Sequence, residues 1–339
     1  MRDALLIHGM HGLGDNLHQR AVIRQLMNRH DIWLETPWPC VFHDMVGPHL
    51  RLLDKGSRLR TQNKNAFRER AAFSRVVVPP GAKELKVWYR QEDVKKYGFL
   101  GAMMDYCGCA TETADFRLPI PVSWRSKAAA LLNGLDPGKP IMIYRPLVER
   151  TEWNGCASRN SDHAAYADLL ASIRDRFFVV SVADLVPGQE WIVSRAIEAD
   201  ATYHAGELDF ETLAALTARA ALMFCSPGFA IALSQAVGTP TVCIFGGHEN
   251  SRHYIDGARF APFLGIDPIE PCECFSKNHK CRKAIDMPVA LRKLREFVDA
   301  AAGRDTILAR YPADRLGGVA AAVHESGGTR SLDRVAAQC

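Results

Sequence analysis

The sequence lacks any long hydrophobic run. No stretch reaches the roughly 18 apolar residues that a membrane-spanning helix needs, and the apolar segment at 4–9 is too short for the core of a signal peptide. An excess of one charge sign is also missing, because 42 Lys+Arg against 38 Asp+Glu leave a formal net charge of only +4. This balance does not indicate a nucleic-acid-binding protein. Internal repeats and low-complexity segments are absent as well, so we expect a globular, cytoplasmic protein without a transmembrane segment.

The positive charge that is present is concentrated in one part of the chain. Residues 51–96 carry 13 Lys+Arg against 5 Asp+Glu, whereas the rest of the chain carries 29 against 33. A solvated helix face with loops is one explanation of this stretch. Contact with an anionic acceptor, a membrane surface or nucleic acid is the other.

The length and the turn residues predict two domains. A chain of 339 residues exceeds the usual size of one hydrophobic core. The segment 133–140 is rich in turn residues and is followed directly by an apolar strand, which favours a boundary there. We predict an N-terminal domain at 1–136, a C-terminal domain at 140–310 and a partly helical tail at 311–339.

Both predicted domains have the alternating pattern of α/β folds. The first opens with an apolar strand at 4–8, a glycine-rich turn and an amphipathic helix, and has further strands predicted at 31–36 and 74–79. The second has predicted strands at 141–144, 177–183, 201–205, 221–225 and 241–245, with helices at 164–175, near Trp191, at 210–220 and at 229–238. This pattern predicts two doubly wound, Rossmann-like domains that face each other, with ligands at the carboxyl ends of the parallel strands.

The first loop, at 9–15, combines glycines with a carboxylate at the start of a helix. Its glycines are spaced G-x-x-G-x-G and do not match the dinucleotide fingerprint G-x-G-x-x-G, which argues against a nicotinamide enzyme. Asp15 is placed either to accept a proton from a hydroxyl or to serve as the N-cap of the helix. His11 and His18 lie close by, and each is a candidate base, a core hydrogen-bonding group or an exposed side chain.

The second loop, at 225–228, lies between a predicted strand and a predicted helix. The free N–H groups of such a helix start suit a diphosphate. The same strand-turn-helix order is found in hydrolase nucleophile elbows, which would make Ser226 a nucleophile. Phe224 stands where that motif requires glycine, so the hydrolase is the weaker alternative.

Taken together, these features resemble glycosyltransferase family 9, the lipopolysaccharide heptosyltransferases and their relatives. Gly12-Leu13-Gly14-Asp15 is similar to the family's amino-terminal GLGD loop, and the segment 208–246 is similar to its donor-site segment. The resemblance implies a GT-B fold and an inverting, metal-independent transfer of a sugar from a nucleoside-diphosphate sugar to an acceptor hydroxyl. It also implies that Asp15 is the catalytic base.

The resemblance also implies a set of binding residues. The implied donor-binding residues are Arg145, Arg150, Glu190, Ser226, Pro227, Gly228, Gly246 and Gly247, and those of the acceptor side or cleft are Gly12, Gly14, His11 and His18. Arg145 and Arg150, with Trp153, loosely match a cation that precedes a Trp in the family. The chain departs from the family where Ser226 replaces an acid and Ile231 replaces a histidine, so the donor itself stays open.

A third group of residues has the chemistry of a metal site. Cys272, Cys274, His279 and Cys281 fall within ten residues, and three thiols with one imidazole suit a structural zinc ion. Reduced thiols without metal are the alternative, and Cys107 with Cys109 are candidates for additional ligands. No cofactor is expected for catalysis.

Two other functions stay open at this point. One is an α/β hydrolase that uses Ser226, and the other is a nucleotide-sugar-binding protein of the same fold without catalytic activity. The acceptor is open between an anionic glycolipid, nucleic acid and a small molecule, with a peripheral membrane contact as a further partner.

Overall fold

The structure is a computed structural model that describes residues 2–56, 60–135, 137–151, 157–276 and 279–302. Trp153 and the predicted tail at 311–339 lie outside the described residues. No described helix combines the length and the apolar character needed to cross a membrane.

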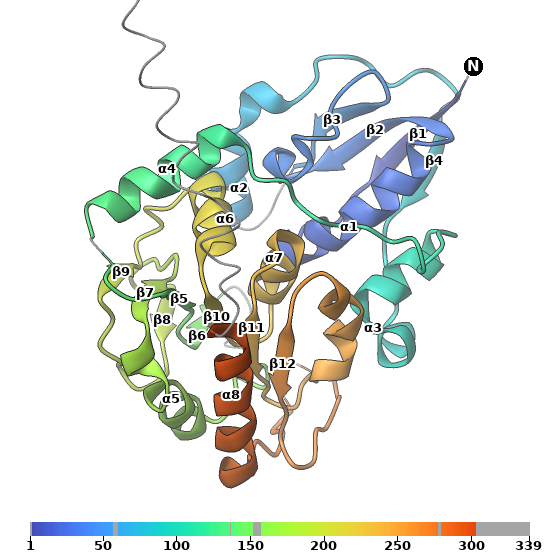
Figure 1. Cartoon of the computed structure of the whole chain (residues 1–339). Helices are drawn as coiled ribbons and strands as arrows, with labels where there is room; N and C mark the ends of the chain where they lie inside the picture. The colour runs from blue at the N-terminus through green and yellow to red at the C-terminus, as the bar shows by residue number, and fades with distance from the viewer. Residues whose placement is uncertain (1, 57–59, 136, 152–156, 277–278, 303–339) are drawn as a thin grey trace, which may run out of the picture.

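The N-terminal half is built around a four-stranded parallel sheet with the order β3-β2-β1-β4 (Figure 1). Its strands are β1 (Asp3–His8), β2 (His30–Thr36), β3 (Leu50–Asp54) and β4 (Lys83–Lys86). Its helices are α1 (Leu13–Leu26), α2 (Arg60–Arg68), α3 (Gln91–Tyr106) and α4 (Val122–Asn133), with short 3-10 turns η1 (Pro39–Phe42) and η2 (Arg70–Ala72). The order reverses between β1 and β4, so the loops after these two strands lie next to each other.

The C-terminal half contains a six-stranded parallel sheet with the order β12-β11-β10-β5-β7-β9. Its strands are β5 (Ile141–Tyr144), β7 (Phe178–Val182), β9 (Ala201–Tyr203), β10 (Leu222–Cys225), β11 (Thr241–Ile244) and β12 (Phe263–Ile266), and a separate antiparallel pair joins β6 (Val148–Arg150) to β8 (Glu190–Ile192). Every residue of β5, β10 and β11 is buried, as expected for central strands with helices on both faces. Here the order reverses between β5 and β10.

Helices cover both faces of this second sheet. They are α5 (His163–Ala171), α6 (Phe210–Arg219), α7 (Phe229–Val237) and α8 (Met287–Ala302), with 3-10 helices η4 (Arg174–Arg176) and η5 (Ser251–Arg259). Two of the helix starts have side-chain caps, because Asp162 and Asp209 accept hydrogen bonds from the backbone N–H groups of Ala165 and Thr212. Helix α7 ends at Gly238, whose left-handed conformation suits glycine.

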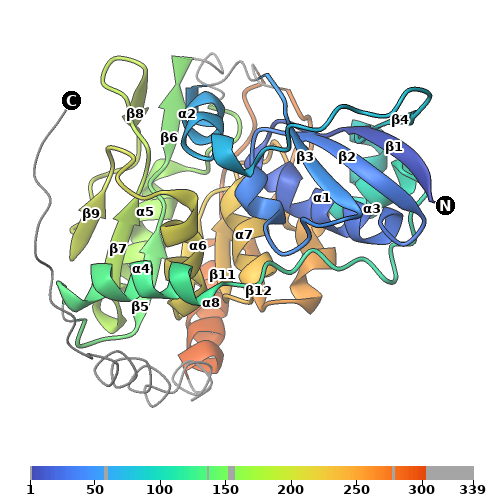
Figure 2. The same ribbon diagram turned by 90° about the horizontal axis from the view of Figure 1, so that it is seen from above.

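The apolar core continues from one half into the other. One cluster joins α1, through Leu17 and Ala21, to α7, through Ile231 and Ala232, while a second fills the opposite face of the larger sheet under α5 and α8. Helix α4 belongs to the first predicted domain but packs against α6, with Trp124 5% exposed and its ring edge-on to Phe210 (Figures 1 and 2). The two halves are therefore joined by packed helices as well as by the chain.

The predicted fold class is confirmed, but two predicted elements are wrong. Residues 74–79 form no strand, because Val76 and Val77 are exposed and the first sheet takes 83–86 as its edge instead. The predicted helix near Trp191 is strand β8, which pairs with β6. In both places the sequence has a local apolar run, and the neighbouring elements that do or do not cover it decide the structure.

Candidate active site

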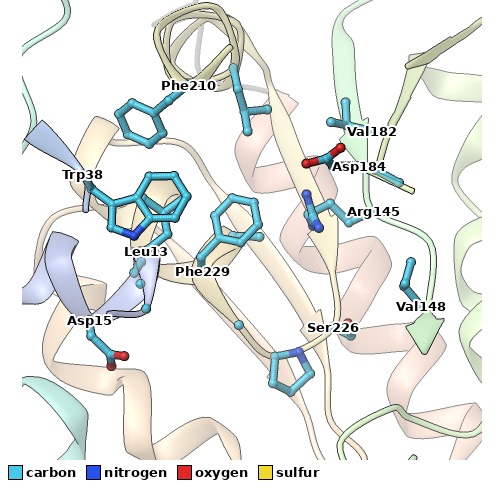
Figure 3. Close-up of a pocket in the computed structure, with 18 of the residues that line it drawn as sticks. Leu13, Asp15, Trp38, Arg145, Val148, Val182, Asp184, Phe210, Ser226 and Phe229 are labelled. Carbon is cyan, nitrogen blue, oxygen red and sulfur yellow. The ribbon is translucent and has the colours of Figure 1, made fainter. Parts of the chain in front are cut away.

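A cavity of about 420 Å³ lies between the two sheets, at the carboxyl ends of their strands (Figure 3). Five cationic side chains of the described chain line it against two carboxylates. The cationic side chains are Lys64, Arg68, Arg145, Arg150 and Arg159. The carboxylates are Asp15 and Asp184. Such a lining favours an anionic ligand.

Asp15 projects into the cavity from the first turn of α1. The N-cap of that helix is Gly12, which has no side chain to accept a hydrogen bond from the first turn, so the alternative in which Asp15 is the N-cap is wrong. Tyr89, from the loop after β4, donates its hydroxyl to Oδ1 of Asp15 at 2.9 Å. Desolvation raises the pKa of Asp15, against the opposing effects of the Tyr89 hydrogen bond and of nearby Arg159. The carboxylate therefore combines a fixed position with increased basicity.

The start of α7 forms the facing wall. Ser226, Pro227 and Gly228 follow β10 and line the cavity, and Gly228 is the N-cap of α7 with φ 149°, a conformation that favours glycine. This end of α7 meets the start of α1, where a Cβ added to Gly14 would lie 3.1 Å from Cα of Phe229. Within the described part of the chain no histidine is bonded to Ser226, so the hydrolase arrangement lacks its general base.

Arg145 lies at the end of β5, beside the start of α7. Its guanidinium stacks over the ring of Phe229, 4.4 Å from the centroid, and points into the cavity (Figure 3). Burial, with a smaller contribution from Arg150, lowers the pKa of Arg145 to about 10, so it stays charged at neutral pH. Among the described residues no carboxylate lies within ion-pair distance of Arg145. A half-buried cation that no described carboxylate pairs, beside a helix start, is suited to a phosphate group.

A second arginine, Arg159, is fixed by an ion pair. Arg159 lines the cavity, and its Nε donates to Oε1 of Glu249 at 2.6 Å, while Tyr254 donates to the other oxygen at 3.2 Å. Burial disfavours the charge of Arg159, but Glu249 and Tyr254 outweigh it and raise its pKa. The positive charge near Asp15 is thus permanent.

Helix α2 crosses from the N-terminal half to the C-terminal half. Arg60 donates to Glu190 at 2.7 Å and lies 3.4 Å from Asp184, and Lys64 also lies 3.4 Å from Asp184. Glu190 is almost completely buried, also pairs with Arg150 at 3.3 Å, and does not line the cavity. This carboxylate, which the resemblance implied to be donor-binding, therefore has two arginine partners of its own.

Aromatic rings line the cavity between the two charged walls. Trp38, Phe210 and Phe229 come from the loop after β2 and from the starts of α6 and α7, and Figure 3 shows the Phe229 ring between Asp15 and Arg145, with Trp38 and Phe210 above Asp15. Trp38 is fixed by the hydrogen bond from its Nε1 to the carbonyl of His11 at 2.8 Å. This wall offers flat apolar surfaces on which a sugar ring or another ligand ring can lie.

The remaining predicted residues are divided between the cavity and its supports. His18 lines the cavity beside Phe116, and burial lowers its pKa to about 4, so it is neutral at physiological pH. His11 contributes its carbonyl to Trp38 and does not line the cavity. Gly246 and Gly247 do not line it, and a Cβ added to them would meet the backbone of Asn160 and the side chain of Cys281, respectively. Their contribution to the site is indirect.

Several site residues were missed by sequence reasoning. Arg60, Lys64 and Arg68 fall in the basic stretch at 51–96, and their spacing of four residues on one helix face was the available signal. Tyr89 and Arg159 carry no local signal, since each reaches the site through chain folding alone.

The Cys and His residues predicted to form a metal site do come together. The ligand atoms of Cys272, Cys274, His279 and Cys281 all lie within 4.8 Å of one another, and none of the four residues lines the cavity. The suggestion that Cys107 and Cys109 add ligands is wrong, because these thiols lie after α3 and do not belong to the group.

Comparison with known proteins places the fold. No protein-family model and no curated protein sequence matches the chain. Solved structures of the same fold include E. coli ADP-heptose lipopolysaccharide heptosyltransferase II (15% identity, 87% of this chain and 98% of that chain covered, TM-score 0.52) and a glycosyl transferase family 9 protein from Veillonella parvula (12%, 87% and 97%, 0.57). A third is the dodecameric, iron-containing glycosyltransferase TibC from enterotoxigenic E. coli (13%, 90% and 77%, 0.56). The resemblance to glycosyltransferase family 9 is thus confirmed at the level of the fold, with the predicted GT-B arrangement of two Rossmann-like halves.

Proposed function

We propose that this protein is an inverting glycosyltransferase of the family 9 type, which moves a sugar from a nucleoside-diphosphate sugar to an acceptor hydroxyl. One observation carries the proposal. The two points where strand order reverses face each other across one cavity, with a carboxylate at the first and, at the second, a cation that no carboxylate of the described residues pairs. Asp15 is the candidate base, and Arg145 with the start of α7 is the candidate diphosphate site.

The proposed reaction uses only side chains and backbone groups. Asp15 accepts the proton of the acceptor hydroxyl, whose oxygen attacks the anomeric carbon as the bond to the diphosphate breaks on the opposite face. Arg145 and the N–H groups at the start of α7 stabilise the negative charge that develops on the leaving diphosphate. No catalytic cofactor is needed in this scheme, and a structural zinc ion at the Cys–His group stays a prediction from the sequence.

The donor and the location are proposed more coarsely. ADP-linked sugars are the first donors to test, because the E. coli heptosyltransferase of the same fold is named for ADP-heptose. Lys64 and Arg68 lie on the side of the cavity that the N-terminal half provides and favour an anionic acceptor. We also propose a cytoplasmic location, where the cysteines stay reduced.

Nucleotide binding should be visible as thermal stabilisation. A ligand that binds only the folded state raises the melting temperature. At a concentration about 100 times its Kd, it adds about 2.7 kcal/mol to the free energy of unfolding. We expect one nucleoside diphosphate series, with its sugars, to raise the melting temperature while the other bases do not. A folded protein that responds to none of them contradicts the proposal. A protein that binds the donor but shows neither sugar transfer nor slow donor hydrolysis is an inactive relative of the same fold.

The position of the Asp15 carboxylate should depend on Gly12, the N-cap of α1. A Cβ at residue 12 would collide with Oδ2 of Asp15, while the φ of −67° and ψ of 141° at Gly12 are open to any residue. Gly12→Ala should therefore lower kcat about 100-fold, a typical cost of moving a catalytic group by about 1 Å, with little change in melting temperature. Gly47→Ala is the matched control, because nothing lies within 4 Å of its added Cβ. Equal turnover of both variants would show that Asp15 need not be held in place.

A further inference from the structure

The Cys–His group has the dimensions of a tetrahedral metal site. The Sγ atoms of Cys274 and Cys281 are 3.5 Å apart, and Nδ1 of His279 lies 3.4 Å from the Sγ atoms of Cys272 and Cys281. Ligands around a zinc ion, with Zn–S of about 2.3 Å and Zn–N of about 2.0 Å, lie about 3.4–3.8 Å from one another. All the described cysteines are free thiols, so the group is available to a metal.

The loop that carries these ligands is bonded to the segment that follows β11. The backbone N–H of Glu273 donates to the carbonyl of Gly247 at 2.8 Å, and that of Phe275 donates to the carbonyl of His248 at 3.2 Å. A Cβ added to Gly247 would lie 3.3 Å from Cβ of Cys281, so the two segments are in direct contact. The residue that follows His248 is Glu249.

The same loop is also bonded to the segment that carries Arg159. The hydroxyl of Ser158 donates to the carbonyl of Ser276 at 2.9 Å, and Nζ of Lys283 donates to the carbonyl of Ala157 at 2.5 Å. Ser158 is 3% exposed, which makes its bond to the loop a buried one. Arg159 and Glu249 thus form their ion pair on two segments that are each attached to the cysteine loop.

This ion pair is the part of the network that reaches the reacting carboxylate. Arg159 lines the cavity and attracts the charge of Asp15, while Glu249 repels it. None of the four metal-binding candidates touches the cavity itself. An ion bound to them acts on the site only through the two segments.

We propose that Cys272, Cys274, His279 and Cys281 bind one zinc ion, and that this ion fixes the segments 157–161 and 246–250 and so holds Arg159 and Glu249 beside Asp15. Binding of the ion stabilises a loop that has few apolar side chains of its own. Arg159 and Glu249 are then positioning residues. The metal part of this proposal stands on the cysteine loop alone, whereas the effect on turnover rests on the proposed function of Asp15.

Metal analysis tests the first part. The purified full chain should contain about one zinc ion, and after exchange for Co²⁺ it should show thiolate-to-cobalt charge-transfer absorption. Cys281→Ser should lose both signals, whereas Cys109→Ser, which removes a half-buried thiol outside the group, should keep them. Iron in place of zinc would overturn the identification of the metal, and a protein without stoichiometric metal would overturn the site.

Hydrogen exchange tests the second part without any need for activity. Removing the zinc with a chelator should speed exchange of the amides at 157–161 and 246–250 by about tenfold or more, and leave β1 and α1 unchanged. Restoring Zn²⁺ should reverse the change. Unchanged exchange in these two segments would overturn the link between the metal and the site, even if the metal itself is present.

Kinetics then test whether the link runs through the ion pair. Glu249→Gln breaks the pair without touching a metal ligand, so it should keep the zinc and lower kcat about as much as Cys281→Ser does. Because both variants remove the same support, the double variant should lose little more than either alone. Additive losses would contradict the proposed route. If no donor supports transfer at all, the proposed function fails, and the metal and exchange results still decide this inference.

Discussion

Replacing Asp15 by asparagine should reduce kcat by about 10²- to 10⁴-fold, which is the usual contribution of a positioned general base. Asparagine keeps the shape and still accepts the hydrogen bond from Tyr89, but it cannot take a proton from the acceptor. The nucleotide should bind with unchanged affinity, since Arg145 and the start of α7 lie on the other wall. Steady-state transfer rates and nucleotide titrations of the same variant give both numbers.

Tyr89→Phe is the control for this experiment. It removes the hydrogen bond to the carboxylate and leaves the base in place, so the loss in kcat should be much smaller than that of Asp15→Asn. A fully active Asp15→Asn variant would remove Asp15 as the base. Equal losses in both variants would mean that Asp15 acts only by holding the Tyr89 hydroxyl.

The raised pKa of Asp15 gives the pH dependence a definite sign. The base works only when ionised, so kcat/KM should fall as the pH drops through a pKa above the ordinary value of an aspartate. A folded-state pKa above the unfolded one means that the folded protein prefers the neutral acid, so ionisation lowers stability as the pH rises. Asp15→Asn should therefore melt at a higher temperature than the parent at neutral pH, and the difference should vanish in acid, below both pKa values.

Replacing Arg145 by methionine should weaken binding of the nucleoside diphosphate by about 10- to 100-fold, the range expected for the loss of hydrogen bonds from a charged donor. Methionine retains apolar packing against Phe229, so the lost charge dominates the effect. The affinity for the nucleoside without phosphates should change little. Calorimetric titration with both ligands separates the diphosphate contribution from that of the base and ribose.

Two further variants make the Arg145 result specific. Arg145→Lys keeps the charge but loses the paired N–H groups, so it should recover part of the affinity. Arg292→Met, on the exposed face of α8, removes an arginine whose ion pair with Glu296 is in solvent and should change nothing. Unaltered diphosphate binding by Arg145→Met would place the leaving group elsewhere in the cavity.

Much of the fold could be predicted because its strands and helices follow from local patterns of apolar and turn residues. The strands β1, β5, β10 and β11 are short apolar runs bounded by turn residues, and α6 and α7 start after clear turn signals. Where exposure decides the outcome, the same signals failed. Val76 and Val77 are apolar but exposed, and Trp191 is 43% exposed on a strand that exists only because β6 lies beside it.

The candidate site divides in the same way. Arg145 directly follows β5, and Asp15 and Gly228 lie at the helix starts that come after β1 and β10, so the rule that parallel sheets bind ligands at their carboxyl ends points to each of them. Glu190 has a similar place in the sequence, yet it is buried and paired with Arg60 from α2, 130 residues away. No spacing within the sequence distinguishes a free carboxylate from one that has found such a partner.

The sequence by itself determined the α/β class, the two glycine-containing loops and the Cys–His group, because each depends on residues within a few positions of one another. Only the tertiary structure decided that Asp15 takes its hydrogen bond from Tyr89 and its nearby charge from Arg159, and that the cysteine loop supports that arginine. The physical reason is the distance along the chain over which each interaction acts. Backbone conformation and periodic burial are local, whereas desolvation and charge pairing depend on which distant segments the packed core brings together.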